Sequence, residues 1–269
     1  MNNITLGQYL PLDSFFHKLD PRTKICAMFA ILIAIFIPTG FVGYGVIAVV
    51  LVASYLAAKL KFSYVLKAMK PMIFMIGFLL IINCFVIQTG TLLVEFWKIK
   101  IYSDALIQTL YIVFRLFLML MTTTLLTATT KPLDLTLGLE DLMAPLQKIN
   151  VPTHDISMMI SLALRFIPTL MEEAERILKS QASRGVDLEN GSFKEKIQAI
   201  LSLIVPLFVS CFQKADDLAD AMEARGYIVG GERVRYKQLK FKGGDYVVLI
   251  IVNLLLAALI GYSIWLKKA

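Results

Sequence analysis

Residues that build metal sites and disulfide frameworks are scarce in this sequence. Its 269 residues include three cysteines, Cys26, Cys84 and Cys211, and two histidines, His17 and His154. They are far apart, and the cysteines mostly have apolar neighbours, so no metal-ligand or disulfide spacing occurs. The sequence therefore predicts no metal site and inert, buried thiols.

Nucleotide-binding loops and membrane-embedded carboxylates are also missing. No G-x-x-x-x-G-K-[ST] loop occurs, so the chain is expected to hold no nucleotide by that device and to contain no cofactor. None of the long apolar segments contains Asp or Glu, which ion-coupled carriers and intramembrane hydrolases usually place at mid-membrane. A stand-alone secondary carrier and a membrane-embedded lipid enzyme therefore remain only as alternatives.

Apolar residues, in contrast, are abundant. They make up 58% of the chain, against roughly 45–50% in soluble domains, so a bilayer must act as solvent for much of it. A helical span needs about 20 mostly apolar residues. Five segments approach this length: Ile25–Ile37, Phe41–Ala58, Pro71–Gln88, Ala105–Ala128 and Tyr246–Trp265. The predicted fold is an all-α integral membrane protein with about five transmembrane helices.

The charges divide the chain into three parts. Residues 129–242 carry 15 basic and 15 acidic residues, whereas the remainder carries 12 basic and 5 acidic ones. We expect four spans in 1–128, a helical domain in 129–242 and a last span in 243–269. The basic excess flanks apolar helices, so it indicates membrane orientation and not nucleic-acid binding.

Basic loops predict which side of the membrane each part faces. Lys59, Lys61, Lys67 and Lys70 form one such loop, and the positive-inside rule places it in the cytoplasm. The N-terminus and the polar domain are then also expected on the cytoplasmic side of the cell membrane. The C-terminus is expected outside the cell, although Lys267 and Lys268 argue against this. A further span could hide in Ile197–Phe212, but its 16 residues and Pro206 favour a helix packed within the domain.

Two helices are predicted at the start of the polar domain. Pro132–Ile149 begins with a proline suited to a helix start, and Ile156–Ser183 has apolar residues at spacings of three, four or seven. The second is therefore a long amphipathic helix. Its Glu172, Glu173 and Glu175 are read as a solvated face, with a cation site as the alternative.

The pattern that best indicates function is a pair of helix ends 41 residues apart. Ser183-Arg184-Gly185 and Ala224-Arg225-Gly226 each combine a small residue, an arginine and a glycine. Glycine caps a helix in the left-handed conformation, and arginine meets the negative end of the helix dipole, so capping alone is one interpretation. The other is a pair of equivalent docking points, since arginine offers a five-donor fork to a partner.

Arg115 is the only charge inside the predicted span Ala105–Ala128. An intramembrane arginine suggests function by default. A structural role is the preferred interpretation, with Arg115 bonded to helix-end carbonyls or to Asn83 across the bundle.

Several motifs together resemble the transmembrane T component of energy-coupling factor transporters. They are the N-terminal run Leu19-Asp20-Pro21-Arg22-Thr23-Lys24, the segment Thr129-Thr130-Lys131-Pro132, the segment Leu164-Arg165-Phe166-Ile167-Pro168 and the two Arg-Gly ends. The resemblance extends from about Tyr9 to Tyr227, and the signature looks like the shared, multi-vitamin type.

This resemblance implies a non-catalytic scaffold with several partners. These are two cytoplasmic ABC-type ATPases, expected as a heterodimer, which bind the ATP, and a separate membrane substrate-binding S component. It also implies that each Arg-Gly end sits in a groove of one ATPase, through Arg184 and Arg225. Ser183 departs from the family's alanine but is still small.

Overall fold

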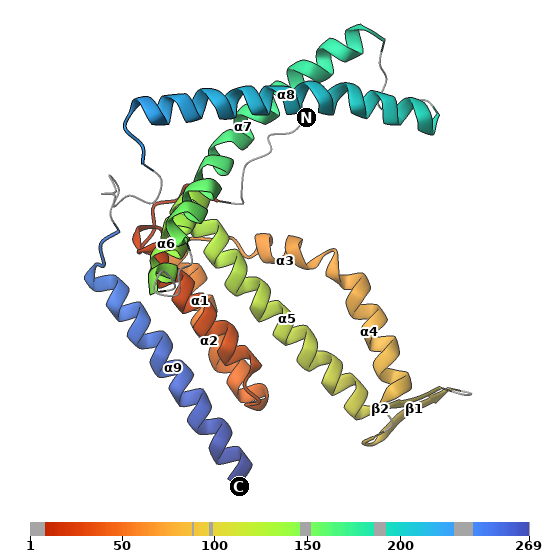
Figure 1. Ribbon diagram of the computed structural model, residues 1–269. Helices are drawn as coiled ribbons and strands as arrows, with labels where there is room; N and C mark the ends of the chain where they lie inside the picture. Colours follow the sequence, from red (N-terminus) through yellow and green to blue (C-terminus); the bar gives the residue numbers. More distant parts are fainter. Residues whose placement is uncertain are drawn as a thin grey trace. The chain divides into compact units, whose positions relative to one another are not determined.

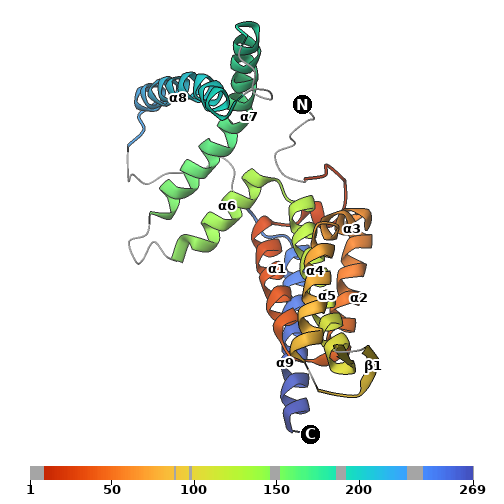
Figure 2. The same cartoon turned by 90° about the vertical axis from the view of Figure 1, so that its right-hand side faces the viewer.

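The computed structural model describes residues 9–87, 89–96, 99–145, 152–185, 192–228 and 239–268. The chain forms two compact units (Figures 1 and 2). The membrane unit comprises residues 1–153 and 239–269, and the second unit comprises residues 154–238.

Helix α1 (Pro21–Phe36) is the centre of the membrane unit. It packs against α2 (Gly40–Ala58), α5 (Ser103–Thr129) and α9 (Gly243–Lys268), which lie beside it in both views (Figures 1 and 2). Proline at the first position and Asp20 as N-cap start α1, because the Asp20 carboxylate accepts a bond from the Arg22 N–H. The core of this bundle is apolar and includes Ile35, Ile47, Leu51 and Leu118.

Two short elements flank this bundle. Helix α3 (Ser63–Met69) is bent by 55° from α4 (Met72–Val86), with Pro71 as the N-cap of α4. Between α4 and α5, strands β1 (Leu92–Phe96) and β2 (Ile99–Tyr102) pair in antiparallel fashion. The helical fold class predicted from composition is confirmed, and this hairpin is a small addition to it.

The spans agree with the prediction in number but not in every member. By length and composition α2, α5, α8 (Phe193–Ala224) and α9 could cross a membrane, as could α3 and α4 counted as one bent span. Helix α1 has only 16 residues, about 24 Å, which is shorter than a hydrocarbon core of roughly 30 Å. Neighbouring helices nevertheless cover most of the surface of α1, with Phe29, Ile33 and Phe36 left exposed.

Helix α6 (Pro132–Met143) belongs to the membrane unit and not to the second unit. It packs on α1, and Arg22 pairs with Asp141 across the contact at 3.4 Å. The division therefore falls after Thr153, later than the boundary expected at residue 129. The predicted helix Pro132–Ile149 ends earlier than expected, and residues 146–149 of it lie outside the described residues.

Gly138 allows the close approach of α6 to α1. A Cβ atom there would lie 2.9 Å from Cβ of Pro21 and 3.2 Å from the Arg22 nitrogen. We expect Gly138→Val to push the helices apart at a cost of roughly 1–3 kcal/mol, the usual range for overpacking. Gly45→Val is the matched control, because a Cβ at Gly45 meets nothing within 4 Å. Thermal unfolding of the purified chain tests this, and equal melting temperatures for both variants would contradict the packing argument.

The second unit contains two long helices, α7 (Thr153–Ser183) and α8. The long amphipathic helix predicted at Ile156–Ser183 is confirmed. Both helices continue through an internal proline, Pro168 in α7 and Pro206 in α8.

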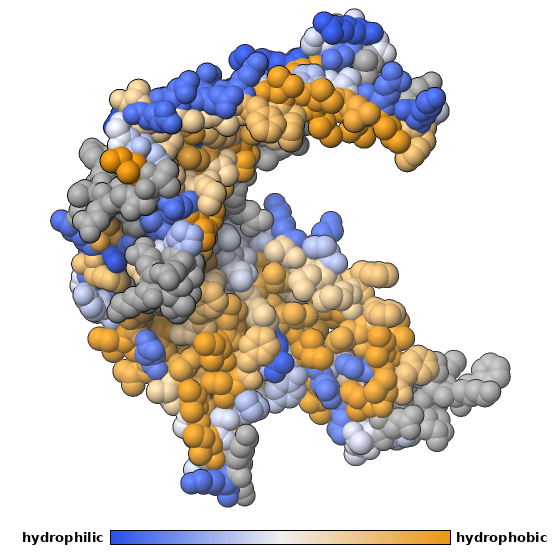
Figure 3. Space-filling view, in the orientation of Figure 1, coloured by the Kyte–Doolittle hydropathy of each residue, from blue (hydrophilic) through white to orange (hydrophobic). Residues whose placement is uncertain are grey.

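The prediction for Ile197–Phe212 needs correction. This segment is part of a 32-residue helix, and its large apolar side chains are exposed and not packed within the unit, as Ile204, Phe208 and Phe212 show. Figure 3 shows hydrophilic residues along one side of α8 and hydrophobic residues along the other. Helix α8 continues through Pro206, which removes one of its backbone hydrogen bonds.

Candidate functional site: two exposed helix ends

Helix α7 ends in the conformation that its glycine permits. The Gly185 N–H donates to the Ala182 carbonyl at 3.0 Å, and Gly185 has a φ of +83°. A residue with a Cβ atom is strained in this left-handed region. Arg184 donates its own N–H to the Gln181 carbonyl at 3.0 Å, so the backbone of the last turn is capped.

Helix α8 ends in the same way, with a more complete cap. Gly226 has a φ of +74°, and its N–H donates to the Glu223 carbonyl at 2.8 Å. The Tyr227 N–H donates to the Met222 carbonyl at 3.0 Å. These two bonds form a Schellman motif. The capping interpretation is therefore confirmed for both glycines, and it accounts for the glycines but not for the arginines.

The side chains at both ends are exposed. Ser183, Arg184, Ala224 and Arg225 all face solvent, and a Cβ atom at either glycine would meet nothing within 4 Å. Among the described residues, no side-chain hydrogen bond or ion pair is recorded for either arginine. Two guanidinium groups with unused donors are thus presented at two similarly built helix ends, an arrangement suited to carboxylates or carbonyls of another molecule.

A polar contact joins α7 to α8. Glu173 forms an ion pair with Lys214 and accepts a hydrogen bond from the Ser210 hydroxyl. Gln181 also donates to the Ser202 carbonyl at 3.3 Å. Of the three glutamates read as a solvated face, Glu173 therefore helps to join the helices. No group of three or more potential metal ligands occurs among the described residues.

The contact borders a polar cavity within the second unit. It has a volume of about 610 Å³, and its lining includes Glu172, Arg176, Pro206 and Arg184. Arg184 therefore stands at the edge of the α7–α8 contact. A partner that binds Arg184 would therefore act close to the contact between α7 and α8.

The N-terminal run Leu19–Lys24 contributes three residues to a polar junction in the membrane unit. This junction consists of Asp20, Arg22, Lys24, Asp141 and Asp245. Arg22 pairs with Asp20 at 3.1 Å and with Asp141, and stacks over Phe241 with its Cζ 4.2 Å from the ring centroid. Lys24 donates to the Thr129 carbonyl at 2.9 Å. The motif thus connects the ends of α1, α5, α6 and α9.

Asp245 completes the junction and was not singled out from the sequence. It is fully buried, and its carboxylate accepts bonds from the Asp20 N–H at 2.8 Å and the Lys242 N–H at 2.7 Å. The available signal was an aspartate directly before the last apolar segment, where acidic residues favour a helix N-terminus. Its partner, 225 residues away, had no such signal.

The segment before α1 folds back onto the end of α5. The Leu10 N–H donates to the Ala128 carbonyl at 3.0 Å, and His17 Nε2 donates to the Leu10 carbonyl at 3.0 Å. Ser14 pairs with His17 Nδ1 at 2.7 Å. Burial lowers the pKa of His17 from its usual value, which favours the neutral ring.

Arg115 and Asn83 have separate partners, so the expected bond between them is replaced by two others. Arg115 Nε donates to the Tyr44 hydroxyl at 3.1 Å, and its Cζ lies 5.3 Å from the Phe36 ring centroid. Asn83 donates to the Thr109 hydroxyl at 3.0 Å. Arg115 connects α5 to α1 and α2, and Asn83 connects α4 to α5. Both residues thus join helices within the membrane unit.

Taken together, a bundle of apolar helices and a second unit of two long helices with glycine caps define a helical membrane protein with a separate polar unit. Residues 13–236 match the family described as cobalt transport protein, CbiQ. The energy-coupling factor transporter transmembrane protein EcfT of Clostridium kluyveri is 40% identical over 269 residues, which is 100% of both chains.

Other relatives agree with this match. The proteins of the same description from Lactococcus lactis and Bacillus subtilis are 39% and 38% identical, over 98% and 96% of this chain and 99% and 98% of their own. The chain therefore belongs to the family of energy-coupling factor transporter transmembrane proteins, and it is a membrane component of such a transporter. The resemblance inferred from the sequence motifs is confirmed.

Proposed function

We propose that the chain is the scaffold through which two cytoplasmic ATPase subunits drive uptake of vitamins or other micronutrients. In this proposal the solute enters through a separate membrane substrate-binding subunit. The single observation that carries the proposal is the pair of exposed Arg-Gly helix ends in one unit, with capped backbones and arginine side chains that pair with none of the described residues. Two similarly built helix ends suit two similar partner subunits.

The partners supply the chemistry in this proposal. ATP binds to the ATPases, and this chain performs no catalysis itself. The second unit and the N-terminus face the cytoplasm, as the basic loop Lys59–Lys70 predicts. The solute is a vitamin, as the shared-type motifs imply, while the family description of cobalt transport makes Co²⁺ the solute to test beside it.

The proposed mechanism uses the α7–α8 contact. Closure of the ATPases on ATP moves the ends at Arg184 and Arg225 relative to one another. Because Glu173 and Lys214 join the two helices, this movement changes the angle between α7 and α8. The change tilts or releases the substrate-binding subunit, a transition of the hinge or shear kind.

Reconstitution tests the proposal. Proteoliposomes containing this chain, its two ATPases and one substrate-binding subunit should accumulate labelled vitamin, or ⁵⁷Co²⁺, only when ATP is present on the ATPase side. A non-hydrolysable ATP analogue and proteoliposomes with this chain alone are the controls. Accumulation by the chain alone without ATP would contradict the scaffold function and favour a secondary carrier.

A further inference from the structure

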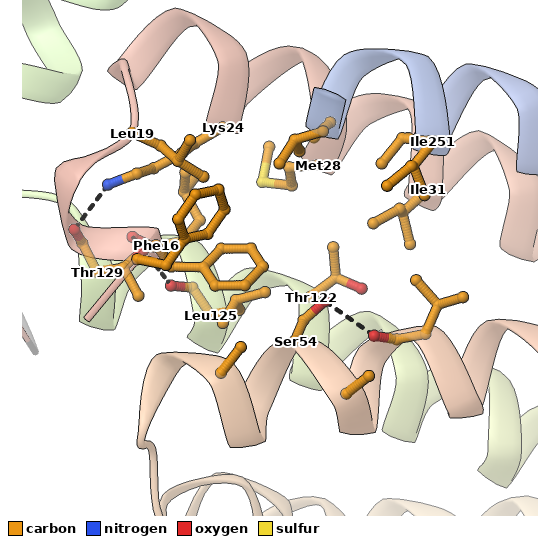
Figure 4. Close-up of a pocket in the computed structure, with 18 of the residues that line it drawn as sticks. Phe16, Leu19, Lys24, Met28, Ile31, Ser54, Thr122, Leu125, Thr129 and Ile251 are labelled. Carbon is orange, nitrogen blue, oxygen red and sulfur yellow. Dashed lines mark hydrogen bonds between the residues drawn. The ribbon is translucent and has the colours of Figure 1, made fainter. Parts of the chain in front are cut away.

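An apolar groove runs between α2 and α9 in the membrane unit, on the surface of α1 and α5. Its volume is about 410 Å³, within the usual range of roughly 300–1,000 Å³ for ligand pockets. Figure 4 shows Met28 and Ile31 of α1 pointing toward Ser54 of α2, with Leu125 of α5 and Ile251 of α9 around the same space. Phe16 and Leu19 close one end.

The polar side chains in this lining have hydrogen-bond partners within the protein. Lys24 donates to the Thr129 carbonyl, and the hydroxyls of Ser54 and Thr122 donate to carbonyls one turn earlier in their own helices, both at 2.8 Å. The Thr129 hydroxyl donates likewise to the Leu125 carbonyl at 2.7 Å. The lining of the groove is therefore mostly apolar, and it favours a hydrocarbon chain over a polar ligand.

The groove is open on the side of the surrounding membrane. Ala53 and Ala57 line its α2 side and are exposed, and Val247 and Ile251 on the α9 side are each 53% exposed. Close-packed interiors contain few voids larger than a water molecule, so a space of this size next to lipid will be filled. The neighbouring material at this depth is acyl chain.

The charged side chains at the closed end of the groove indicate which kind of lipid headgroup would fit there. Lys18 lies beside Phe16 in the 3-10 turn η1 (Phe16–Lys18), Lys59 and Lys61 follow the last groove residue of α2, and Lys240 and Lys242 precede the first groove residue of α9. All five side chains are exposed, and no ion pair is recorded for them in the described part of the chain. Of the carboxylates at this end, Asp20 and Asp245 are buried and already accept hydrogen bonds, Asp134 is half-buried near Lys24, and Asp13 is exposed, so the lysines outnumber the exposed carboxylates.

We propose that the α2–α9 groove binds one acyl chain of an anionic phospholipid, whose phosphate lies among these lysines. Lysine binds phosphate as a flexible point charge, and juxtamembrane lysines attract anionic lipid. The bound chain completes the packing of four helices that leave this space between them. This binding site is independent of the ATPase-docking proposal, because it involves only the membrane unit.

Photo-crosslinking tests the site. The purified full-length chain is placed in nanodiscs containing phosphatidylglycerol with a diazirine in its acyl chain, and adducts are mapped by peptide mass spectrometry. We expect adducts concentrated on groove residues such as Met28 and Ile251. Phosphatidylcholine with the same labelled chain should label them several-fold less.

Two sets of variants sharpen the test. Ala53→Phe with Ala57→Phe should fill the groove and reduce its labelling several-fold, whereas Val52→Phe, on the opposite face of α2 and 37% exposed, should not. Replacing Lys18, Lys59 and Lys61 by Gln should remove the preference for phosphatidylglycerol. Monodisperse gel filtration of each variant confirms folding.

Three results would overturn the proposal. They are adducts spread evenly over the outer surface of the spans, equal labelling by the two lipids, and groove residues that crosslink to a second copy or to a partner protein in the assembled transporter while excluding lipid. If the filled variant does not fold, the adduct map and the lipid preference of the unaltered chain still decide the question.

Discussion

Replacing Arg184 and Arg225 together by glutamate is expected to remove the ATPase subunits from the purified transporter. In the proposed complex each arginine meets carboxylates or carbonyls of one ATPase. Loss of a hydrogen-bonded charge partner in an interface costs roughly 2–5 kcal/mol, which is a loss in affinity of about 30-fold or more at each end. Glutamate adds like-charge repulsion. ATP-driven uptake should fall to background with the loss of assembly.

The stability of the chain itself should change little in this double variant. Both side chains are exposed and make no hydrogen bond or ion pair within the described residues, and substitutions at such positions usually change stability by less than about 0.5 kcal/mol. Lys179→Glu is the matched control, because Lys179 is an exposed cation near the end of the same helix. Quantitative co-purification measures the result, and wild-type amounts of ATPase on the double variant would refute docking through these ends.

The second large effect is expected at the polar junction, where Asp245→Ala should destabilise the membrane unit. The substitution leaves the N–H groups of Asp20 and Lys242 without their acceptor. Hydrogen bonds to a charged group contribute roughly 1.5–3 kcal/mol each, and Asp245 is fully buried, so water does not replace it readily. The two bonds together contribute roughly 3–6 kcal/mol, so at roughly 2–4 °C per kcal/mol the melting temperature should fall by about 6–24 °C.

Matched variants separate this effect from a simple change of charge. Asp13→Ala removes an exposed carboxylate from the same unit and should leave the melting temperature unchanged. Asp245→Asn keeps one carbonyl acceptor and should lie between the alanine variant and the unaltered chain. Thermal unfolding of the detergent-purified chain is the measurement. Equal melting temperatures for Asp245→Ala and Asp13→Ala would contradict the assigned role of the junction.

Most helices could be predicted because their signals are local. Long apolar runs indicated α2, α5 and α9, and spacings of three and four indicated α7. The same locality produced the errors. Ile197–Phe212 was expected to pack within the polar domain, but its large apolar side chains are exposed, and the all-helical prediction contained no strand where β1 and β2 pair.

The candidate site was predictable to a different extent in its two parts. Glycine after a helix determines the left-handed cap wherever the helix lies, so the ends at Gly185 and Gly226 followed from the sequence. Contacts across the fold did not. The sequence suggested Asn83 as a partner for Arg115, but the packing of α5 against α2 placed Tyr44 within reach instead.

The sequence by itself thus determined the membrane class, the two capped Arg-Gly helix ends and, through its motifs, the family. These depend on hydropathy, periodicity and residue types over short stretches of chain. Only the tertiary structure decided that α6 packs on α1, that Glu173 meets Lys214 and that α2 and α9 leave a groove between them. Each of these depends on which surfaces meet, and residues as distant as Asp20 and Asp245 carry no local mark of their partner.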